Sequence, residues 1–363
     1  MSAVSEVVHT CLRHNLPLAL RGRPGVGKTT MTRAAATQLG MGFELVIGSL
    51  REPTDLAGLP FVRSDETVAL APPRWAVEAC KPHDIGHVVL LDELTTATPA
   101  VQAAMLRIIQ ERVVGEFQLP SDVRIIAAYN DADDCGGYEL VLPMRSRLLH
   151  LEVTPDVDAF TDAMVNGWPV VAPMIEKPDE IRRAELRSGW GCMIAAFLKA
   201  RPELIEVPPK IGSWGGYPTP RTWEMTIDAL TAADLDCVSS TARKLLVEGC
   251  IGAGSAFELL EFIRNADLPD PRDVLRDPAS VLAYLQHERP DRAYAVIMSV
   301  AQSAIVAESA ELWTNSWTVA AHAIDAGFGD VLAWTYKNVP SARPHGATTP
   351  PEFKRVSDFL AVA

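Results

Sequence analysis

The sequence feature that most constrains the fold is a glycine-rich segment near the amino terminus, Gly22-Arg-Pro-Gly-Val-Gly-Lys-Thr29. Its spacing, G-x-x-x-x-G-K-T, is that of a phosphate-binding loop, in which glycines let backbone N–H groups approach phosphate oxygens. A short apolar run at 16–20 precedes the segment, and a helical pattern at 31–39 follows it. This strand-turn-helix context is the one that the loop requires, so the segment predicts an α/β fold that holds a phosphate group at a helix N-terminus.

The loop also predicts individual contacts. We expect Lys28 to reach the phosphates and the Thr29 hydroxyl to bind Mg²⁺. An ordinary glycine turn with an exposed lysine is the alternative, and the flanking strand and helix patterns argue against it. The whole predicted phosphate-binding set is Gly22, Arg23, Pro24, Gly25, Val26, Gly27, Lys28, Thr29 and Thr30.

A second constraint is the run His87-Val-Val-Leu-Leu-Asp92-Glu93, in which four apolar residues are followed by two acids. The run predicts a buried parallel strand whose carboxylates emerge at its carboxyl end, where ligands bind in open α/β sheets. Asp92 would hold Mg²⁺. Glu93, expected on the opposite face of the strand, would orient and polarise an attacking water. A strand that simply ends in solvated acids is the alternative.

Two later strand patterns carry polar residues at their ends. The run 124–130 ends in Asn130, whose amide can bind a water or a phosphate oxygen; an asparagine satisfied by backbone groups is the alternative. Arg145 and Arg147 directly precede a further strand pattern at 148–153. Guanidinium groups there suit stabilisation of phosphoryl-transfer charge, and an exposed basic turn is the alternative.

Helical periodicity replaces the strand patterns from residue 154 onward. We therefore expect an α/β nucleotide-binding core at 1–153, a helical domain at 154–272 and a helical carboxyl-terminal extension at 273–363. Arg221 falls in the first turn of a predicted helix. A cation there is unfavourable for the helix dipole, which indicates an anionic partner.

Composition narrows the function classes. The chain has 363 residues, 48% of them hydrophobic, and a net charge of −13. This is the composition of a globular chain of about two or three domains, and its acidity argues against nucleic-acid binding, which depends on lysine and arginine. The sequence shows neither a secretion signal nor a membrane-spanning run, so we expect a cytoplasmic protein without membrane association. The cluster His9, Cys11 and His14 lacks a fourth ligand for zinc.

These elements occur in an order that resembles the AAA+ ATPases, and within them the MoxR-like branch. The resemblance covers about residues 16–272 and implies a parallel α/β core, a helical lid, and ATP with Mg²⁺ bound at the boundary between subunits of a ring, usually a hexamer. The segments that carry it are 22–29, Pro53-Thr-Asp-Leu-Ala-Gly58, Leu91-Asp-Glu-Leu94, 101–113 and Pro220-Arg-Thr-Trp223.

The same resemblance implies roles for single residues. Arg147 best fits the arginine finger that reaches a neighbouring subunit, with Arg145 as its competitor. The segments 43–72 and 113–122 resemble a helix-two insert and a pre-sensor hairpin that face the ring's pore. Leu94-Thr95-Thr96 departs from the Asn-Arg that MoxR-like proteins commonly carry after the acids. The remaining roles are Lys28 and Thr29 in Walker A, Asp92 and Glu93 in Walker B, Asn130 as sensor 1 and Arg221 as sensor 2.

The leading hypothesis is therefore an ATP-hydrolysing, ring-forming protein that remodels, matures or assembles a protein client. The resemblance adds the expectation of a partner with a von Willebrand A domain. One alternative is a nucleic-acid motor or loader of the same fold, against which the acidic charge counts. Another is a small-molecule P-loop kinase, which would leave Glu93, Asn130 and Arg221 without a shared role.

Overall fold

The computed structural model describes residues 2–83, 85–166, 180–210, 212–266, 268–306 and 309–362. Its internal contacts divide the chain into two compact units. The first comprises Met1–Pro178 and Glu206–Ala256, and the second comprises Asp179–Ile205 and Phe257–Ala363. The division of the sequence into three domains at residues 153 and 272 remains a prediction.

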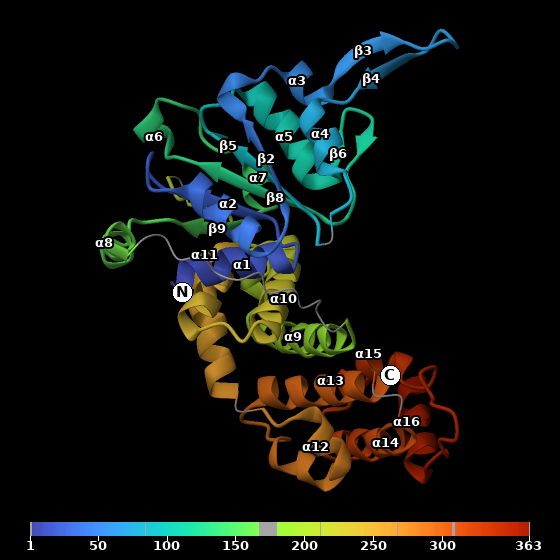
Figure 1. The fold of residues 1–363 in the computed structure, drawn as a ribbon. Helices are drawn as coiled ribbons and strands as arrows, with labels where there is room; N and C mark the ends of the chain where they lie inside the picture. Colours follow the sequence, from blue (N-terminus) through green and yellow to red (C-terminus); the bar gives the residue numbers. More distant parts are fainter. Residues whose placement is uncertain are drawn as a thin grey trace. The chain divides into compact units, whose positions relative to one another are not determined.

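The first unit is built on a five-stranded sheet with the strand order β2-β5-β8-β1-β9 (Figure 1). All neighbouring strands are parallel, which confirms the predicted α/β fold class. The carboxyl ends of parallel strands share one edge of the sheet, so the phosphate loop, Glu93 and Asn130 follow their strands at the same edge. The strands are β1 (Leu18–Arg21), β2 (Gly42–Ile47), β5 (His87–Asp92), β8 (Val123–Tyr129) and β9 (Leu149–Glu152).

The two central strands explain why the sheet forms. Almost every residue of β5 and β8 is buried, as expected for parallel strands covered on both faces. One helix that packs on this core is α5 (Pro99–Glu111), which begins at the N-cap Thr98 and ends at Arg112 with a left-handed backbone. The core on this side includes Val89, Leu91, Val101, Met105, Ile108, Ile125 and Ala127.

Further helices and two hairpins complete the first unit. The helices are α1 (Ala3–Arg13), α2 (Lys28–Gln38), α3 (Pro53–Ala57), α4 (Arg74–Ala79), α6 (Ala132–Cys135), α7 (Leu142–Arg145), α8 (Val157–Asn166), α10 (Pro220–Leu235) and the start of α11 (Ser240–Ala266). The hairpins pair β3 (Leu59–Val62) with β4 (Val68–Ala71) and β6 (Val113–Val114) with β7 (Phe117–Gln118). Figure 1 shows the β3–β4 hairpin projecting away from the sheet.

Helix α1 is fastened to the end of α10 by a single buried carboxylate. Asp236 accepts hydrogen bonds from Thr10 at 2.8 Å and from the His14 ring at 2.9 Å, and it pairs with Arg13 at 2.8 Å. Burial alone would raise the pKa of Asp236, but the hydrogen bonds and charges of these partners lower it. The contact therefore joins the first helix of the chain to one 220 residues later.

The second unit is helical. Its core contains Trp313 and Trp317, which are buried with ring centres 5.6 Å apart. Their polar groups are partly satisfied inside the core, where the Trp313 indole donates to the Val339 carbonyl at 2.8 Å. The elements are α9 (Glu180–Ala200), the end of α11, α12 (Pro271–Arg276), α13 (Pro290–Val306), α14 (Ala310–Asp325), α15 (Gly329–Thr335) and α16 (Pro351–Val362).

Candidate functional site

The glycine-rich loop connects β1 to α2 as predicted, and its glycines have separate purposes. Gly25 and Gly27 have φ angles of 82° and 93°, in the left-handed region that favours glycine. A Cβ at either position would meet nothing within 4 Å, so the space around these two residues is open. Gly22 instead lies against the backbone, because a Cβ there would come within 2.5 Å of the Val153 carbonyl oxygen.

Lys28 is held at the mouth of this loop. Its side chain is buried, and Nζ donates to the Gly22 carbonyl at 2.6 Å, the Arg23 carbonyl at 3.2 Å and Asn130 Oδ1 at 2.7 Å. Burial lowers the pKa of Lys28, and the nearby Asp92 carboxylate opposes that shift. The ammonium group is therefore surrounded by oxygen acceptors of the kind that a phosphate offers. The structure brings together the predicted Lys28 and Asn130.

Thr29 and Asp92 form the second contact between predicted residues. Thr29 Oγ1 donates to Asp92 Oδ2 at 2.7 Å, and Asp92 Oδ1 accepts from the Glu93 N–H at 2.8 Å. A hydroxyl and a carboxylate side by side are hard oxygen ligands, which Mg²⁺ prefers when it also binds substrate phosphates. These two residues fit the predicted metal.

Glu93 lies just beyond the strand, and the argument from strand alternation does not apply to it. Strand β5 ends at Asp92, and Glu93 has a left-handed backbone with φ of 59°. Such a conformation costs a non-glycine residue about 1–3 kcal/mol and is often found at functional sites. The Glu93 carboxylate accepts a hydrogen bond from the Ser49 hydroxyl, and Thr96 Oγ1 lies 3.5 Å away.

Ser49 is one of two site residues that the sequence analysis missed. It lies in the short 3₁₀ turn η1 (Gly48–Leu50) that follows β2. Because β2 and β5 pair in register, with Ile47 beside Asp92, the residues after both strands meet at the same edge. The sequence does place the Ser49 hydroxyl two residues after the end of β2. It does not show that β2 and β5 are neighbours, so it could not place Ser49 beside Glu93.

Arg21 is the other missed residue. Its guanidinium makes two hydrogen bonds to Asp131, both of 2.6 Å, and one to Glu152 of 2.7 Å. It also lies 4.1 Å from the centre of the Trp214 ring. Arg21 thus ties the strand before the phosphate loop to the residue after Asn130 and to the end of β9. The sequence does contain an arginine at the end of one strand and acids at the ends of two others, and this pattern could have indicated the ion pairs of Arg21.

The two finger candidates occupy different environments. Arg145 is buried and donates to the Gly215 carbonyl at 2.9 Å and to Ser213 Oγ at 3.4 Å. Its own carbonyl accepts from the His150 ring at 3.0 Å, and burial lowers the pKa of His150 to about 4, which leaves that ring neutral. Arg145 therefore anchors the loop that contains Ser213 within its own chain.

Arg147 is only partly buried. One of its terminal nitrogens donates to the Pro143 carbonyl at 2.5 Å. Burial and then the neighbouring Arg221 guanidinium lower the pKa of Arg147. Arg221 is exposed and occupies the second position of α10, as predicted. The charge of Arg221, at the N-terminus of α10, thus acts on Arg147, and an anion near both cations would stabilise them.

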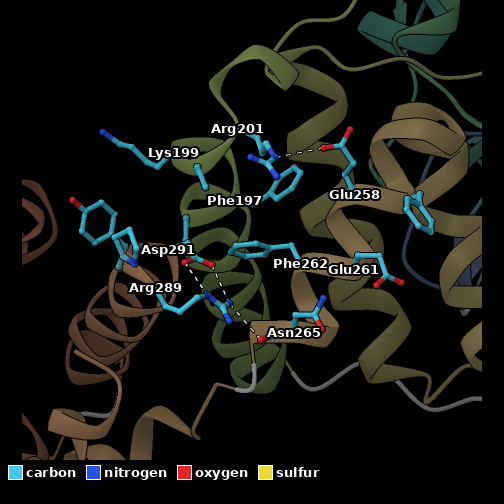
Figure 2. Close-up of a pocket in the computed structure, with 14 residues that line it drawn as sticks. Phe197, Lys199, Arg201, Glu258, Glu261, Phe262, Asn265, Arg289 and Asp291 are labelled. Carbon is cyan, nitrogen blue, oxygen red and sulfur yellow. Dashed lines mark hydrogen bonds and ion pairs between the residues drawn. The ribbon is translucent and has the colours of Figure 1, made fainter. Parts of the chain in front are cut away.

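Two cavities differ in their chemistry. A pocket of about 380 Å³ lies beside Asn130, and its lining includes Arg21, Thr95 and Trp214. A larger hollow of about 870 Å³ lies in the second unit, where Figure 2 shows Arg289 directed toward Asp291. The larger hollow is lined by Phe197, Phe257, Phe262 and Tyr294 together with ion pairs, and its lining residues contain no glycine-rich loop. Size alone therefore does not identify the site.

Comparison with known proteins agrees with this geometry. The AAA domain (dynein-related subfamily) matches residues 17–148, which contain the phosphate loop and the acids Asp92 and Glu93 at the end of β5. The protein MoxR of Methylorubrum extorquens is 33% identical over 167 residues, which are 45% of this chain and 46% of MoxR. The chain therefore contains an AAA-type domain at residues 17–148 and is similar to MoxR over 167 residues.

The match to MoxR spans about half the length of that relative. A solved structure of a proposed ATPase from Cytophaga hutchinsonii is 16% identical to this chain, and the match covers 72% of this chain and 88% of that structure with a TM-score of 0.47. That superposition carries no argument about the site. Within the described residues, none of the helices has the length and hydropathy needed to span a membrane.

Proposed function

We propose that this protein binds ATP with Mg²⁺ and hydrolyses it as a ring of subunits. The observation that carries the proposal is the pair of contacts Lys28–Asn130 and Thr29–Asp92, of 2.7 Å each. These contacts bring the ends of β1, β5 and β8 together beside the phosphate loop. The AAA domain, which is of a nucleotide-hydrolysing type, supports the same reading.

Each side chain has a task in this proposal. Lys28 binds phosphate oxygens, and Thr29 with Asp92 holds Mg²⁺, which when bound neutralises phosphate charge. Glu93 orients the attacking water and accepts its proton. Asn130, next to Lys28, hydrogen-bonds the water or a phosphate oxygen.

We assign the role of the finger to Arg147. Arg145 is buried and already donates to two groups of its own chain, whereas Arg147 is partly exposed and lies beside Arg221. An arginine supplied from a neighbouring subunit contributes on the order of 10³ to 10⁵ in rate in phosphoryl-transfer enzymes. Hydrolysis should then depend on assembly.

Mixing two inactive variants tests this assignment. Lys28→Ala removes phosphate binding but keeps Arg147, and Arg147→Ala keeps the site but removes the finger. Each variant alone should hydrolyse ATP at least about 100-fold more slowly than the wild type. A mixture should recover part of the activity, because an intact site then borders an intact Arg147. Arg74→Ala, whose side chain is 91% exposed, is the control and should leave hydrolysis unchanged.

The results distinguish the assignment of Arg147 as the arginine finger from the proposed ATP hydrolysis itself. If Arg147→Ala behaves like Arg74→Ala, the finger assignment is wrong while ATP hydrolysis stands. If the wild type neither binds nor hydrolyses ATP under conditions in which light scattering shows it assembled, the proposed function is wrong. Phosphate transfer to a small molecule by a monomer would favour the kinase alternative.

A protein client is the second part of the proposal. The β3–β4 hairpin exposes apolar side chains, with Leu59 68%, Val62 71% and Val68 62% exposed, and an exposed apolar surface favours contact with another protein. We propose that hydrolysis moves such segments of a ring, usually of six subunits, against a client. A partner with a von Willebrand A domain and a cytoplasmic location belong to the same proposal.

The Glu93→Gln variant provides the test, because it should bind ATP without hydrolysing it and so retain a client. Proteins captured by Glu93→Gln from a lysate of the native host should be lost when Val62→Ser is added. The control addition is Arg63→Ser, a polar change at the neighbouring position of the same hairpin. Equal capture by both double variants would exclude the hairpin as the contact.

A further inference from the structure

We propose that His83 and His87 form a binding site for a borderline transition-metal ion such as Zn²⁺, separate from the phosphate loop. His87 is the first residue of β5, and Asp92 is the last. Five residue steps of about 3.3 Å separate the two ends, so the histidines lie about 17 Å from the site of hydrolysis. The ion would be a second metal of the protein, held by nitrogen ligands.

The first observation is an unsatisfied buried imidazole. His87 is 5% exposed, and in the described structure neither of its ring nitrogens has a hydrogen-bond partner. Leaving a buried polar group without a partner destabilises the folded protein. Native proteins supply nearly all such groups with a protein, water or ion partner, so His87 requires one.

The second observation is that His83 converges on the same place. The two ring centres are 5.2 Å apart. A Cβ built on Gly42 would lie 2.2 Å from His87 Nδ1 and 2.7 Å from His83 Nε2. The two nitrogens are therefore less than about 5 Å apart, and tetrahedral zinc with bonds of about 2.0–2.1 Å needs its nitrogens about 3.4 Å apart. His83 is exposed, so a small side-chain rotation can close the difference.

Gly42 keeps the space between the rings free. It begins β2 and is paired with His87 in the sheet register. Any other residue at position 42 would place its Cβ against both nitrogens. A glycine thus leaves room where two ligand atoms converge.

The ligand set is limited to two imidazoles. In the described part of the chain, no three His, Cys, Asp or Glu side chains are grouped closely enough to hold a metal together. Cys80 precedes the pair in a C-x₂-H-x₃-H spacing, but it does not form such a group with the two rings. Solvent would complete the coordination, and imidazole ligands suit Zn²⁺, Ni²⁺ and Cu²⁺.

A metal ion bound by the two histidines would cross-link two parts of the fold. His83 lies in the connection between α4 and β5, and His87 lies in the sheet. A bound ion would fasten that connection to the starts of β2 and β5. Binding to the folded state alone raises thermal stability.

Titration of the full-length protein with ZnCl₂ in a calorimeter tests the site, with EDTA-treated protein and no nucleotide. His83→Ala is the decisive variant because its exposed side chain can be removed without loss of the fold. We expect the wild type to bind one Zn²⁺ saturably, and His83→Ala to bind it at least about tenfold more weakly. His345→Ala, at another exposed histidine, is the matched control and should bind like the wild type.

Two further variants define the ligands. Asp92→Asn should leave Zn²⁺ binding unchanged, because the proposed site does not include the phosphate loop. Cys80→Ser should also leave it unchanged, and Co²⁺ bound to the wild type should show no thiolate charge-transfer absorption. The proposal is overturned if the wild type shows no saturable binding, if His83→Ala binds as tightly as His345→Ala, or if either Asp92→Asn or Cys80→Ser abolishes binding.

Discussion

Replacement of Arg21 by glutamine should weaken both the fold and the site, since this guanidinium connects three strand ends. Hydrogen bonds to charged groups can contribute about 1.5–3 kcal/mol, but the partner side chains of Asp131 and Glu152 are 43% and 49% exposed. Solvent screening therefore reduces each ion pair to about 0.5–1 kcal/mol. The stacking of Arg21 on Trp214 adds about 0.5–1 kcal/mol. We expect Arg21→Gln to lower the free energy of unfolding by about 1.5–3 kcal/mol.

The same change should reduce turnover more than nucleotide binding. Asp131 directly follows Asn130, which bonds Lys28. If Arg21 positions this segment, its loss misplaces the Asn130 amide while the phosphate loop itself stays intact. We expect kcat to fall about tenfold, which corresponds to about 1.4 kcal/mol, with KM changed less than threefold.

Urea unfolding followed by circular dichroism and steady-state ATP hydrolysis measure the two effects. Arg23→Gln is the matched control, because Arg23 lies two residues after Arg21, in the phosphate loop, with its side chain 83% exposed and its paired carboxylate, on Asp134, 3.7 Å away. It should change stability by less than about 0.5 kcal/mol. The reasoning is refuted if Arg21→Gln and Arg23→Gln are equally stable, or if Arg21→Gln raises KM at unchanged kcat.

Three other changes have defined outcomes. Gly22→Ala places a Cβ 2.5 Å from the Val153 carbonyl oxygen, so fluorescent ATP binding should weaken at least about tenfold, and unchanged affinity would contradict the close contact. Ser49→Ala frees the Glu93 carboxylate from its donor and should raise basal hydrolysis about twofold or more at unchanged ATP affinity; a rate equal to wild type would show that the contact does not restrain Glu93. Asp236→Asn should lower the free energy of unfolding at pH 7 by about 1–3 kcal/mol. Burial alone would raise the pKa of Asp236, but the donors and charges around it lower it, so this stabilisation is present above the unfolded pKa of about 3.9 and is lost as the pH falls through the folded value. The difference from wild type in urea unfolding should therefore shrink below about pH 4, and a constant difference would exclude the charge as its cause.

The sheet was predictable because local patterns determine it. A phosphate loop needs a strand before it and a helix after it, and the segments at β5 and β8 are apolar runs that only a doubly covered sheet accommodates. The start of helix α5 also follows from the local sequence, since Pro99 follows the N-cap Thr98 and favours the first helical position. In each case the residue types and their immediate neighbours were sufficient to predict the secondary structure.

The β3–β4 hairpin was not predicted as strands because its pattern is uninformative. All four residues of β3 are exposed although each is apolar or proline. Alternation of buried and exposed residues, which normally marks a strand, is therefore missing. The strand pairing comes from antiparallel contacts of Leu59–Val62 with Val68–Ala71, and the sequence gives no separate sign of them.

The histidines also show that the sequence does not reveal contacts between distant segments. The sequence analysis considered His9, Cys11 and His14 because they are close in the chain, yet the rings of His9 and His14 bond different partners, Gln38 and Asp236. The pair at 83 and 87 converges only because a glycine on another strand leaves space. Proximity in sequence was a poor guide, since the deciding residue lies some forty positions earlier.

The state of Lys28 connects the fold to the chemistry of the site. Burial makes the charged ammonium less favourable, as its lowered pKa records, and the nearby Asp92 carboxylate only partly compensates. A phosphate group beside Lys28 would supply further negative charge and so stabilise the protonated form. Burial of the charged Lys28 destabilises the folded protein without nucleotide. A bound phosphate removes part of that destabilisation and so contributes to the free energy of nucleotide binding. By the same linkage nucleotide should raise the thermal stability of the wild type more than that of Lys28→Met, in which the buried charge is absent.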